Sequence, residues 1–414
     1  MKKLPSIIWF LSGGLFFVGA GQAVVFITIP PLARDLGLTE IQTGTIFASS
    51  ALAWMIFSPF WGRLSDRIGR KTVVLVGLLG CAISLILFST ALNMGTSNIL
   101  LGWKLLAVLI VARMVNGVLG SATRPAAGAW IADVTNLDER SAGYGRLNSG
   151  FSAGRIVGPA IAGFLLLISY TLPFYIFSFG LLITAFVLVR QPSKNKCGKS
   201  EEKESKLKLF DSNVWPFILV AACMGICNAA LVQTSSFYFQ DVITPEASNP
   251  ITFASIGFMF VAFGSLVGQL LVADKLRISP GSLVRYGTLV SAISLFFVSF
   301  SHSLTAIYIS FFLVGLGQGT QSTGLSAALS LSVGQENQGK ANGFMGMILP
   351  VGHVISPVVA MPLYMKSPEL PYLLGGCAMF VTLIFIQISS RHKWIRKKGY
   401  RHINLNSNQT VEEA

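Results

Sequence analysis

The chain has 414 residues, of which 52% are hydrophobic and 12% are charged. Soluble domains carry about 25% charged residues, so this composition excludes an ordinary soluble enzyme or binding module. The formal net charge of +14 would suit a nucleic-acid partner, but the basic residues are dispersed along the chain instead of clustered, which argues against one.

Continuously apolar stretches recur along nearly the whole chain, and each is long enough to cross a hydrocarbon core as a helix of about 20 residues. Strands of a membrane barrel would instead alternate apolar and polar residues. The sequence therefore predicts an all-α membrane protein with twelve transmembrane helices. In chain order, we expect spans at residues 7–29, 40–60, 72–91, 100–132, 147–168, 172–190, 214–240, 251–272, 282–300, 303–331, 341–364 and 370–390.

A polar segment rich in Lys, Glu and Ser separates the first six spans from the last six, and its composition cannot bury a core. We expect an N-terminal six-helix bundle over residues 1–190, a cytoplasmic linker over 191–213, a C-terminal six-helix bundle over 214–390 and a basic tail over 391–414. Basic residues gather in the linker, in the tail and in the other connections on the same side. This pattern predicts that both termini lie in the cytoplasm.

The two predicted bundles repeat part of their sequence. Residues 19–23 match residues 225–229, and residues 154–159 match residues 352–357. A duplicated six-helix unit predicts a substrate site between the halves, near the middle of the membrane.

The connection between the second and third spans carries a dense group of glycines and charged residues. In order, these are Gly62, Asp66, Arg67, Gly69, Arg70 and Lys71, spaced as G-x-x-x-D-R-x-G-R-K. The glycines permit a tight turn, and the carboxylate can pair with arginines near the start of the third span. We expect this group to act as a cytoplasmic gate. A loop that only fixes orientation would explain the arginines but neither the aspartate nor the glycines.

At this connection the chain resembles the major facilitator superfamily, specifically the twelve-helix drug:proton antiporter branch that includes tetracycline efflux pumps. The resemblance covers the whole chain and implies two pseudo-symmetric six-helix bundles. Residues 113–117 are similar to that family's R-x-x-Q-G segment, with Asn116 in place of the glutamine. Residues 154–163 resemble its antiporter signature G-x-x-x-G-P-x-x-G-G, with Ala162 in place of a glycine, and in the family this segment is associated with exporters.

The fifth span and its counterpart in the second half also contain small residues and prolines that suit close helix packing. These are Gly154, Gly158, Pro159, Gly163 and Pro357. A packing segment without a direct role in transport is the alternative interpretation.

Basic side chains occur inside the predicted spans, whereas every Asp and Glu lies in a connection or at a span end. Arg113 and Arg124 lie in the fourth span, Arg155 in the fifth and His353 in the eleventh. A cation inside a membrane needs a partner, so these residues predict an anionic substrate. The alternative is that the arginines bond backbone carbonyls or carboxylates at helix ends, such as Asp133. The family's pumps for lipophilic cations usually place an acid in the first half, and this chain departs from that pattern.

Helical periodicity suggests how these basic residues are arranged. Residues 113, 117, 120 and 124 fall on one stripe, which predicts a groove with an arginine at each end. Arg155 and His353 occupy equivalent positions in the repeat and are interpreted as a pair, in which the arginine holds the substrate and the histidine carries a proton. Asp133 is a second candidate for proton coupling. A histidine that only bonds a neighbouring helix is the alternative for His353.

Amide side chains on the spans that the repeat pairs across the pore are further candidates for substrate binding. They are Gln22, Asn228, Gln233, Gln318 and Gln321, in addition to Asn116. Each of these amides could instead hold two helices together.

Together these features predict a secondary active transporter that works by alternating access in a bacterial cytoplasmic (inner) membrane. We expect a proton-coupled exporter of a small hydrophilic anionic metabolite, such as a polycarboxylate siderophore. Multidrug or antibiotic efflux is one alternative, and import of an organic anion or siderophore is another. No nucleotide-binding or nucleophile motif occurs, so we expect no enzyme activity, no cofactor and no metal site, and a monomer in the lipid bilayer.

Overall fold

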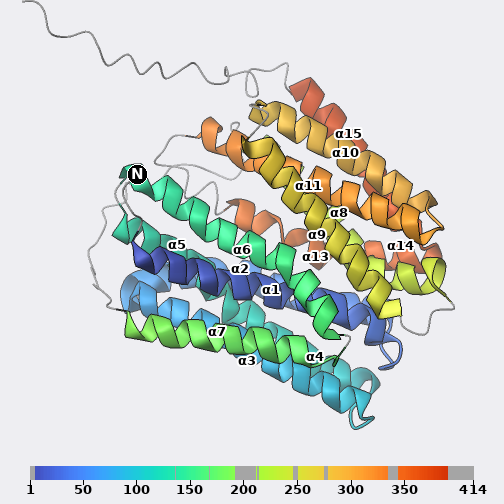
Figure 1. The fold of residues 1–414 in the computed structure, drawn as a ribbon, viewed down its shortest axis with the longest axis horizontal. Helices are drawn as coiled ribbons and strands as arrows, with labels where there is room; N and C mark the ends of the chain where they lie inside the picture. The colour runs from blue at the N-terminus through green and yellow to red at the C-terminus, as the bar shows by residue number, and fades with distance from the viewer. Residues whose placement is uncertain are drawn as a thin grey trace, which may run out of the picture.

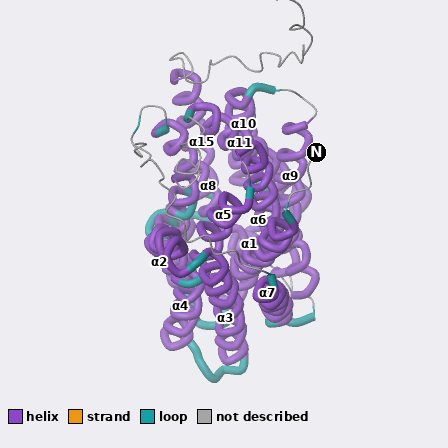
Figure 2. The backbone as a smooth tube through the Cα atoms, turned by 90° about the vertical axis from the view of Figure 1, so that its left-hand side faces the viewer, coloured by secondary structure: helices purple, strands orange, loops and turns teal. Residues whose placement is uncertain are grey.

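The computed structural model describes residues 5–135, 137–166, 168–191, 211, 214–245, 250–274, 278–333 and 344–389. These residues are mostly helical, and no strand occurs among them (Figures 1 and 2). A helix pairs its own backbone groups, which is what a hydrocarbon surrounding requires. The predicted linker lies outside the described residues apart from 191 and 211, and the predicted tail lies outside them entirely.

The first half of the chain forms helices α1 to α7. Their bounds are Ser6–Ala33 (α1), Glu40–Ile68 (α2), Arg70–Thr96 (α3), Gly102–Val118 (α4), Thr123–Val134 (α5), Leu137–Leu166 (α6) and Leu172–Arg190 (α7). A 3-10 turn over Gly120–Ala122 joins α4 to α5, so these two helices make one crossing. We call the end of the bundle where α1 begins the proximal end, and the end where α1 gives way to α2 the distal end.

The second half forms helices α8 to α11 and α13 to α15. The bounds are Trp215–Tyr238 (α8), Pro250–Asp274 (α9), Pro280–Phe300 (α10), Leu304–Ser332 (α11), Val351–Ile355 (α13), Ala360–Lys366 (α14) and Leu370–Ser389 (α15). A π-helical turn, Phe239–Ile243, extends α8 at the distal end. Residues 344–348 are also helical, so the eleventh predicted span is a chain of short helices.

Eleven helical segments of the described residues are long and apolar enough to cross a membrane, judged by length and composition. In this count Gly102–Val134, which contains α4 and α5, is one segment, and so is Phe344–Lys366, which contains α13 and α14. The tenth predicted span forms α11 but is not among them, because its glycines, serines and glutamines lower its hydropathy. Helices α2 and α6 run further toward the proximal end than predicted, through the polar residues 61–68 and 137–146. The apolar run therefore marks the membrane crossing but not the end of the helix.

The two halves lie side by side and meet along equivalent helices. Figure 1 shows α1 to α7, coloured blue to green, below α8 to α15, coloured yellow to red, with α6 bordering α9. The closest packing between the halves joins α6 to α9 and α13 to α2. Since α2 and α9 are the second crossings of their halves, and α6 and α13 belong to the fifth, these two interfaces are related by the repeat.

Glycines let the matched segments pack backbone against backbone in both halves. A Cβ added at Gly154 of α6 would lie 1.9 Å from the carbonyl oxygen of Phe16 on α1. One added at Gly352 of α13 would lie 2.2 Å from the carbonyl oxygen of Gly225 on α8. The repeated residues thus make the same kind of contact in each half, and only glycine leaves room for it.

The equivalent prolines have different effects on their helices. Helix α6 continues through Pro159, whereas the chain leaves the helix at residues 356–359, around Pro357. Proline has no N–H, so the carbonyl four residues earlier, at His353, loses its helical donor. The second-half helix is therefore broken next to the histidine that the sequence singled out.

Candidate functional site

Arg155 projects from the middle of α6 and is the most accessible of the basic side chains inside the bundle. Its Cγ lies 3.4 Å from where a Cβ would stand on Gly19 of α1, and the side chain as a whole is exposed. Its charge acts on both Arg124 and His353. Among the described residues Arg155 has no carboxylate or hydrogen-bond partner, so it is an accessible cation with nothing to neutralise it.

Arg124 lies beside it, at the start of α5. Its guanidinium carbon stands 4.5 Å from the centre of the Phe151 ring on α6. Its Nη2 is 3.4 Å from Oδ1 of Asn148, a long hydrogen bond that holds the group only loosely. Arg124 is half-buried and contacts Phe151, which lies one turn before Arg155 on α6. We call Arg124 and Arg155 the cationic cluster of the α5–α6 contact.

Arg113 is set apart from this cluster and is almost fully buried, with 4% of its surface exposed. Its Nε is buried and has no hydrogen-bond partner within the described parts of the chain. Asp133 does not serve as its counter-ion, because that carboxylate accepts a hydrogen bond of 3.0 Å from Nε of Arg70 at the proximal end. We therefore place Arg113 in the packed interior of the first half.

The groove predicted between Arg113 and Arg124 is not open. A Cβ added at Gly117 would lie 2.6 Å from the nearest atoms of α2, and one added at Gly120 would lie 2.6 Å from the nearest atom of α3. The 3-10 turn also changes the rotation per residue between α4 and α5, so the stripe assumed for one continuous α-helix is lost. Neighbouring helices occupy the space beside the glycines. Of the two arginines at the ends of the predicted groove, only Arg124 belongs to the cationic cluster.

His353 stands where the two halves meet. Its Nδ1 accepts a hydrogen bond of 3.1 Å from the amide nitrogen of Gln233 on α8. In the neutral ring the proton then lies on the other ring nitrogen, Nε2 of His353. The ring also stacks on Phe26 of α1, with centroids 4.8 Å apart. The amide oxygen of Gln233 is buried and has no hydrogen-bond partner among the described residues. His353 thus touches both halves and lies within reach of the charge of Arg155.

The remaining amide candidates divide into two groups. Gln321 is buried and donates a hydrogen bond of 2.9 Å to Oγ1 of Thr288 on α10, so it holds two helices together. Asn116 approaches Oγ of Ser50 on α2 at 3.4 Å and has a similar packing role. The other amides are half-buried and stay candidates for substrate contact, namely Gln22, Asn228 and Gln318.

The predicted gate is an ion-pair network at the proximal end. Arg70 binds the carboxylates of Asp66 at 2.5 Å and Asp133 at 3.0 Å. Gly69, with φ of 96°, makes the turn between α2 and α3 in a conformation that favours glycine. Lys71 donates hydrogen bonds of 2.7 Å to two backbone carbonyl oxygens at the end of α7. All of these partners lie in the first half or, for Gln191, directly after its last helix.

The other two residues predicted for the gate make no such contact in the network. Arg67 is exposed at the end of α2. Gly62 lies next to α5, since a Cβ there would stand 3.7 Å from Cβ of Pro125. The absence of a side chain at Gly62 therefore lets α2 pack close to the start of α5, where Arg124 lies.

Sequence reasoning missed a polar cluster at the distal end, centred on Arg34 and Asp241. The sequence contained a sign of this cluster, because Arg34 is one of the few basic residues in the connections opposite the basic ones. Hydrogen bonds to Asp241 and to Glu40 raise the pKa of Arg34 above the usual range for arginine, so its charge is permanent.

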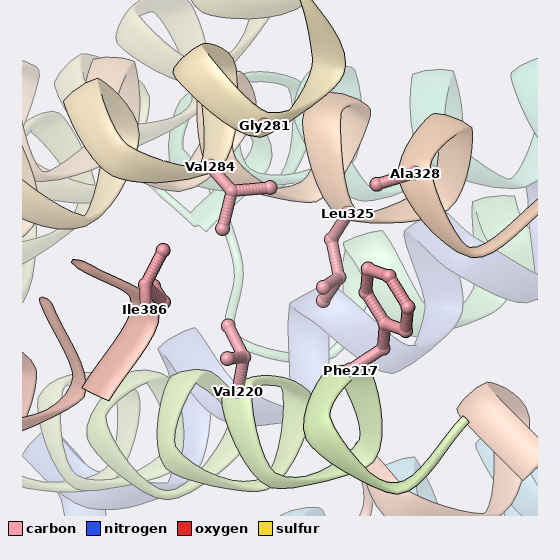
Figure 3. A pocket seen from close by; sticks show the side chains of 7 residues that line it. All are labelled: Phe217, Val220, Gly281, Val284, Leu325, Ala328 and Ile386. Carbon is pink, nitrogen blue, oxygen red and sulfur yellow. The ribbon is translucent and has the colours of Figure 1, made fainter. Parts of the chain in front are cut away.

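A small cavity lies inside the second half, away from the cationic cluster. Its volume is about 10 Å³, which is roughly the size of one water. The side chains around it are apolar and come from α8, α10, α11 and α15: Phe217, Val220, Gly281, Val284, Leu325, Ala328 and Ile386 (Figure 3). A cavity this small and apolar does not suit a transported molecule.

Two repeated helical halves that meet around accessible polar groups define a membrane transporter of the two-halved type. The sequence pattern of the Major Facilitator Superfamily matches residues 11–357 and, again, residues 250–401. The chain therefore belongs to the Major Facilitator Superfamily, a family of transporters and not of enzymes. The predicted fold class and family are confirmed.

Relatives with similar sequences include bacterial resistance proteins. The chain is 26% identical over 408 residues to the quinolone resistance protein NorA of Staphylococcus aureus (strain MSSA476), covering 95% of this chain and 98% of that protein. It is 27% identical over 380 residues to multidrug resistance protein 1 of Bacillus subtilis (strain 168), covering 90% and 93%.

Solved structures share the fold at low sequence identity. A bacterial homologue of the human lysosomal transporter Spinster, in an inward-facing and occupied conformation, superposes with a TM-score of 0.66 at 14% identity, covering 94% of this chain and 95% of that one. The human organic anion transporter MFSD10 also gives a TM-score of 0.66, at 15% identity, covering 92% and 98%.

Proposed function

We propose that this transporter exports drug-like small organic molecules from a bacterial cytoplasm. The observation that carries the proposal is the similarity to quinolone and multidrug resistance proteins over nearly the full length of both chains. These relatives favour drug efflux over the export of a polycarboxylate siderophore, which the sequence alone had placed first. The basic connections favour an orientation with both termini in the cytoplasm, so the distal end faces outward.

The charge of the cationic cluster narrows the class of drug. Arg155 and Arg124 lie together with no described carboxylate near them, and the acids of the described helices lie at helix ends. A substrate that brings its own carboxylate would neutralise this cluster, and its rings could lie against Phe151 and Phe26. Compounds with an acidic group on an aromatic frame therefore fit the site better than lipophilic cations.

Export of a small anionic metabolite is the second candidate. Arg155 favours it, because this side chain is exposed and has no partner in the part of the chain that the structure describes, and a hydrophilic polycarboxylate would neutralise the same cation. Import of an organic anion would use the same contacts, since rocking of two halves is reversible and its direction comes from coupling.

We further propose that the halves over residues 1–190 and 214–390 move against each other around this site, within a monomer. His353 is proposed to carry the coupled proton, because it lies between the halves and an imidazole ring can take up and release a proton. The connection 191–213 would then act as a tether between the two moving parts.

An efflux assay in a pump-deficient bacterial host tests the proposal. Cells expressing the transporter should accumulate less of a fluorescent quinolone than cells carrying the empty vector, and a protonophore should abolish the difference. Ethidium accumulation should not change. Robust ethidium efflux would show that the cationic cluster does not select the substrate. Equal quinolone accumulation in both strains would contradict the proposal of drug efflux. Mass spectrometry of the medium would then test for an exported polycarboxylate.

A further inference from the structure

Arg34 and Asp241 form an ion pair between the two halves at the distal end. Arg34 follows the last residue of α1, and Asp241 lies in the π-helical turn after α8. Both guanidinium Nη atoms donate to the carboxylate, Nη1 to Oδ1 and Nη2 to Oδ2, the second over 2.9 Å. This two-pronged geometry is the strongest arrangement that arginine makes with a carboxylate.

Each member of the pair is also held by its own half. Glu40, the first residue of α2, accepts hydrogen bonds from Nε of Arg34 at 3.0 Å and from Nη2 at 2.6 Å. On the other side, the hydroxyl of Tyr364 on α14 donates to Oδ2 of Asp241 over 2.6 Å. Arg34 is therefore aimed by the first half, and Asp241 by the second.

Neutral contacts at the same end reinforce the pair. Nε2 of Gln240 donates a hydrogen bond of 2.7 Å to the carbonyl oxygen of Pro31, again from the second half to the first. The guanidinium of Arg34 also lies over the ring of Phe237, 5.2 Å from its centre. The π-helical turn carries Gln240 and Asp241 together, and such turns shift the register of a helix, often at functional sites.

The ion pairs of the described residues differ in what they join. At the distal end Arg34–Asp241 connects the halves, whereas Asp66, Arg70 and Asp133 at the proximal end all belong to the first half. We propose that Arg34–Asp241 is a clasp that holds the outer end of the transport path shut in this state. The clasp must break before substrate can leave on the outer side. This inference depends on the fold and on the proposed orientation, but not on the substrate.

The exposure of the clasp suits a contact that breaks in every cycle. The side chains of Arg34 and Asp241 are 39% and 29% exposed, so water and salt screen their attraction in part. Exposed pairs of this kind change an equilibrium by up to about fivefold. A clasp of that strength biases the protein toward outer closure without locking it there.

Hydrogen–deuterium exchange of the whole purified protein in nanodiscs tests the clasp. Asp241→Asn keeps the shape of the side chain but removes its charge. We expect exchange to rise severalfold in peptides around residues 28–44 and 357–370, and to fall around residues 61–71, because the population moves toward outer opening. Simple destabilisation would instead raise exchange at both ends and would overturn the proposal.

Glu40→Gln is the matched control, because it removes a comparable bond to Arg34 that stays within the first half. It should change the exchange pattern much less than Asp241→Asn. Arg34→Gln should reproduce the pattern of Asp241→Asn, and the double variant should add nothing to either single one, since both remove the same bond. Additive effects, or equal effects of Glu40→Gln and Asp241→Asn, would contradict the clasp. If Asp241→Asn does not fold, Arg34→Gln with the Glu40→Gln control decides the question alone.

Discussion

At the scale of single residues, Arg155 differs from Arg113 and Arg124 because it is exposed and has no ion-pair or hydrogen-bond partner among the described residues. Arg113 is packed into the first half, and Arg124 is held by a ring and a weak hydrogen bond. Burying an arginine at membrane depth costs free energy, and arginines found there usually have a function. We therefore expect Arg155 to contact substrate directly.

Arg155→Gln should weaken substrate affinity about tenfold or more at every pH, because a charged hydrogen bond to a carboxylate is lost and arginine does not titrate in this range. Arg155→Lys should retain part of the affinity, since it keeps the charge but not the planar fork. Binding to the purified variants by calorimetry measures this effect. Unchanged affinity in Arg155→Gln would assign the side chain to a structural role.

His353→Gln should leave substrate binding nearly intact but flatten the pH dependence of transport. Glutamine can keep a hydrogen bond to Gln233 but cannot carry a proton between pH 5 and 8. Flux into inside-out vesicles across that range measures the profile. If the variant keeps the wild-type profile and still accumulates substrate uphill, the proton travels elsewhere, with Asp133 or the substrate's own carboxylate as the next candidates.

At the scale of helices, the contact of α1 with α6 depends on glycine at defined positions. Gly154 faces the backbone of α1, while Gly145 on the same helix has no atom within 4 Å of an added Cβ. Both residues are glycines of the same helix, but only Gly154 is in close contact with another helix. Gly145 is therefore a matched control for a substitution at Gly154.

Gly154→Ala should destabilise the protein by about 1–3 kcal/mol or more, because the new methyl group forces two backbones apart. Gly145→Ala should be neutral or slightly stabilising, since alanine favours the helix over glycine. Thermal unfolding of both variants in the same detergent measures the difference. Similar melting temperatures would mean that α1 and α6 can separate at little cost.

At the scale of the whole molecule, the two ends are built differently. The distal end carries an ion pair between the halves, whereas the described ion pairs of the proximal end tie helices of the first half together. Alternating access requires that the two ends open in turn. The proximal network is therefore expected to change partners during the cycle.

Asp66→Asn should leave the protein folded and inserted but reduce turnover severalfold or more. The carboxylate is 58% exposed and holds Arg70, so its loss costs little stability but removes a charge from the moving end. Transport in vesicles that contain equal amounts of wild type and variant measures turnover. Near-normal flux would mean that this connection only fixes the orientation of the chain.

The fold could be predicted from the sequence because its determinants are local. Apolar runs mark membrane crossings wherever they occur, and the repeat and the charged connection after α2 identify the family without any knowledge of packing. The glycines of residues 154–158 and 352 were also visible, because close helix packing demands small residues at fixed spacing.

Tertiary structure decided which residues meet. The stripe from Arg113 to Arg124 looked open on an isolated helix, but α2 and α3 fill the space beside its glycines. Pro159 and Pro357 are equivalent in the repeat, yet only the second interrupts its helix. Arg34 and Asp241 are 207 residues apart, and no local pattern pairs them. Such contacts depend on how the two bundles pack against each other, and that arrangement arises from the sum of many weak interactions across the interface.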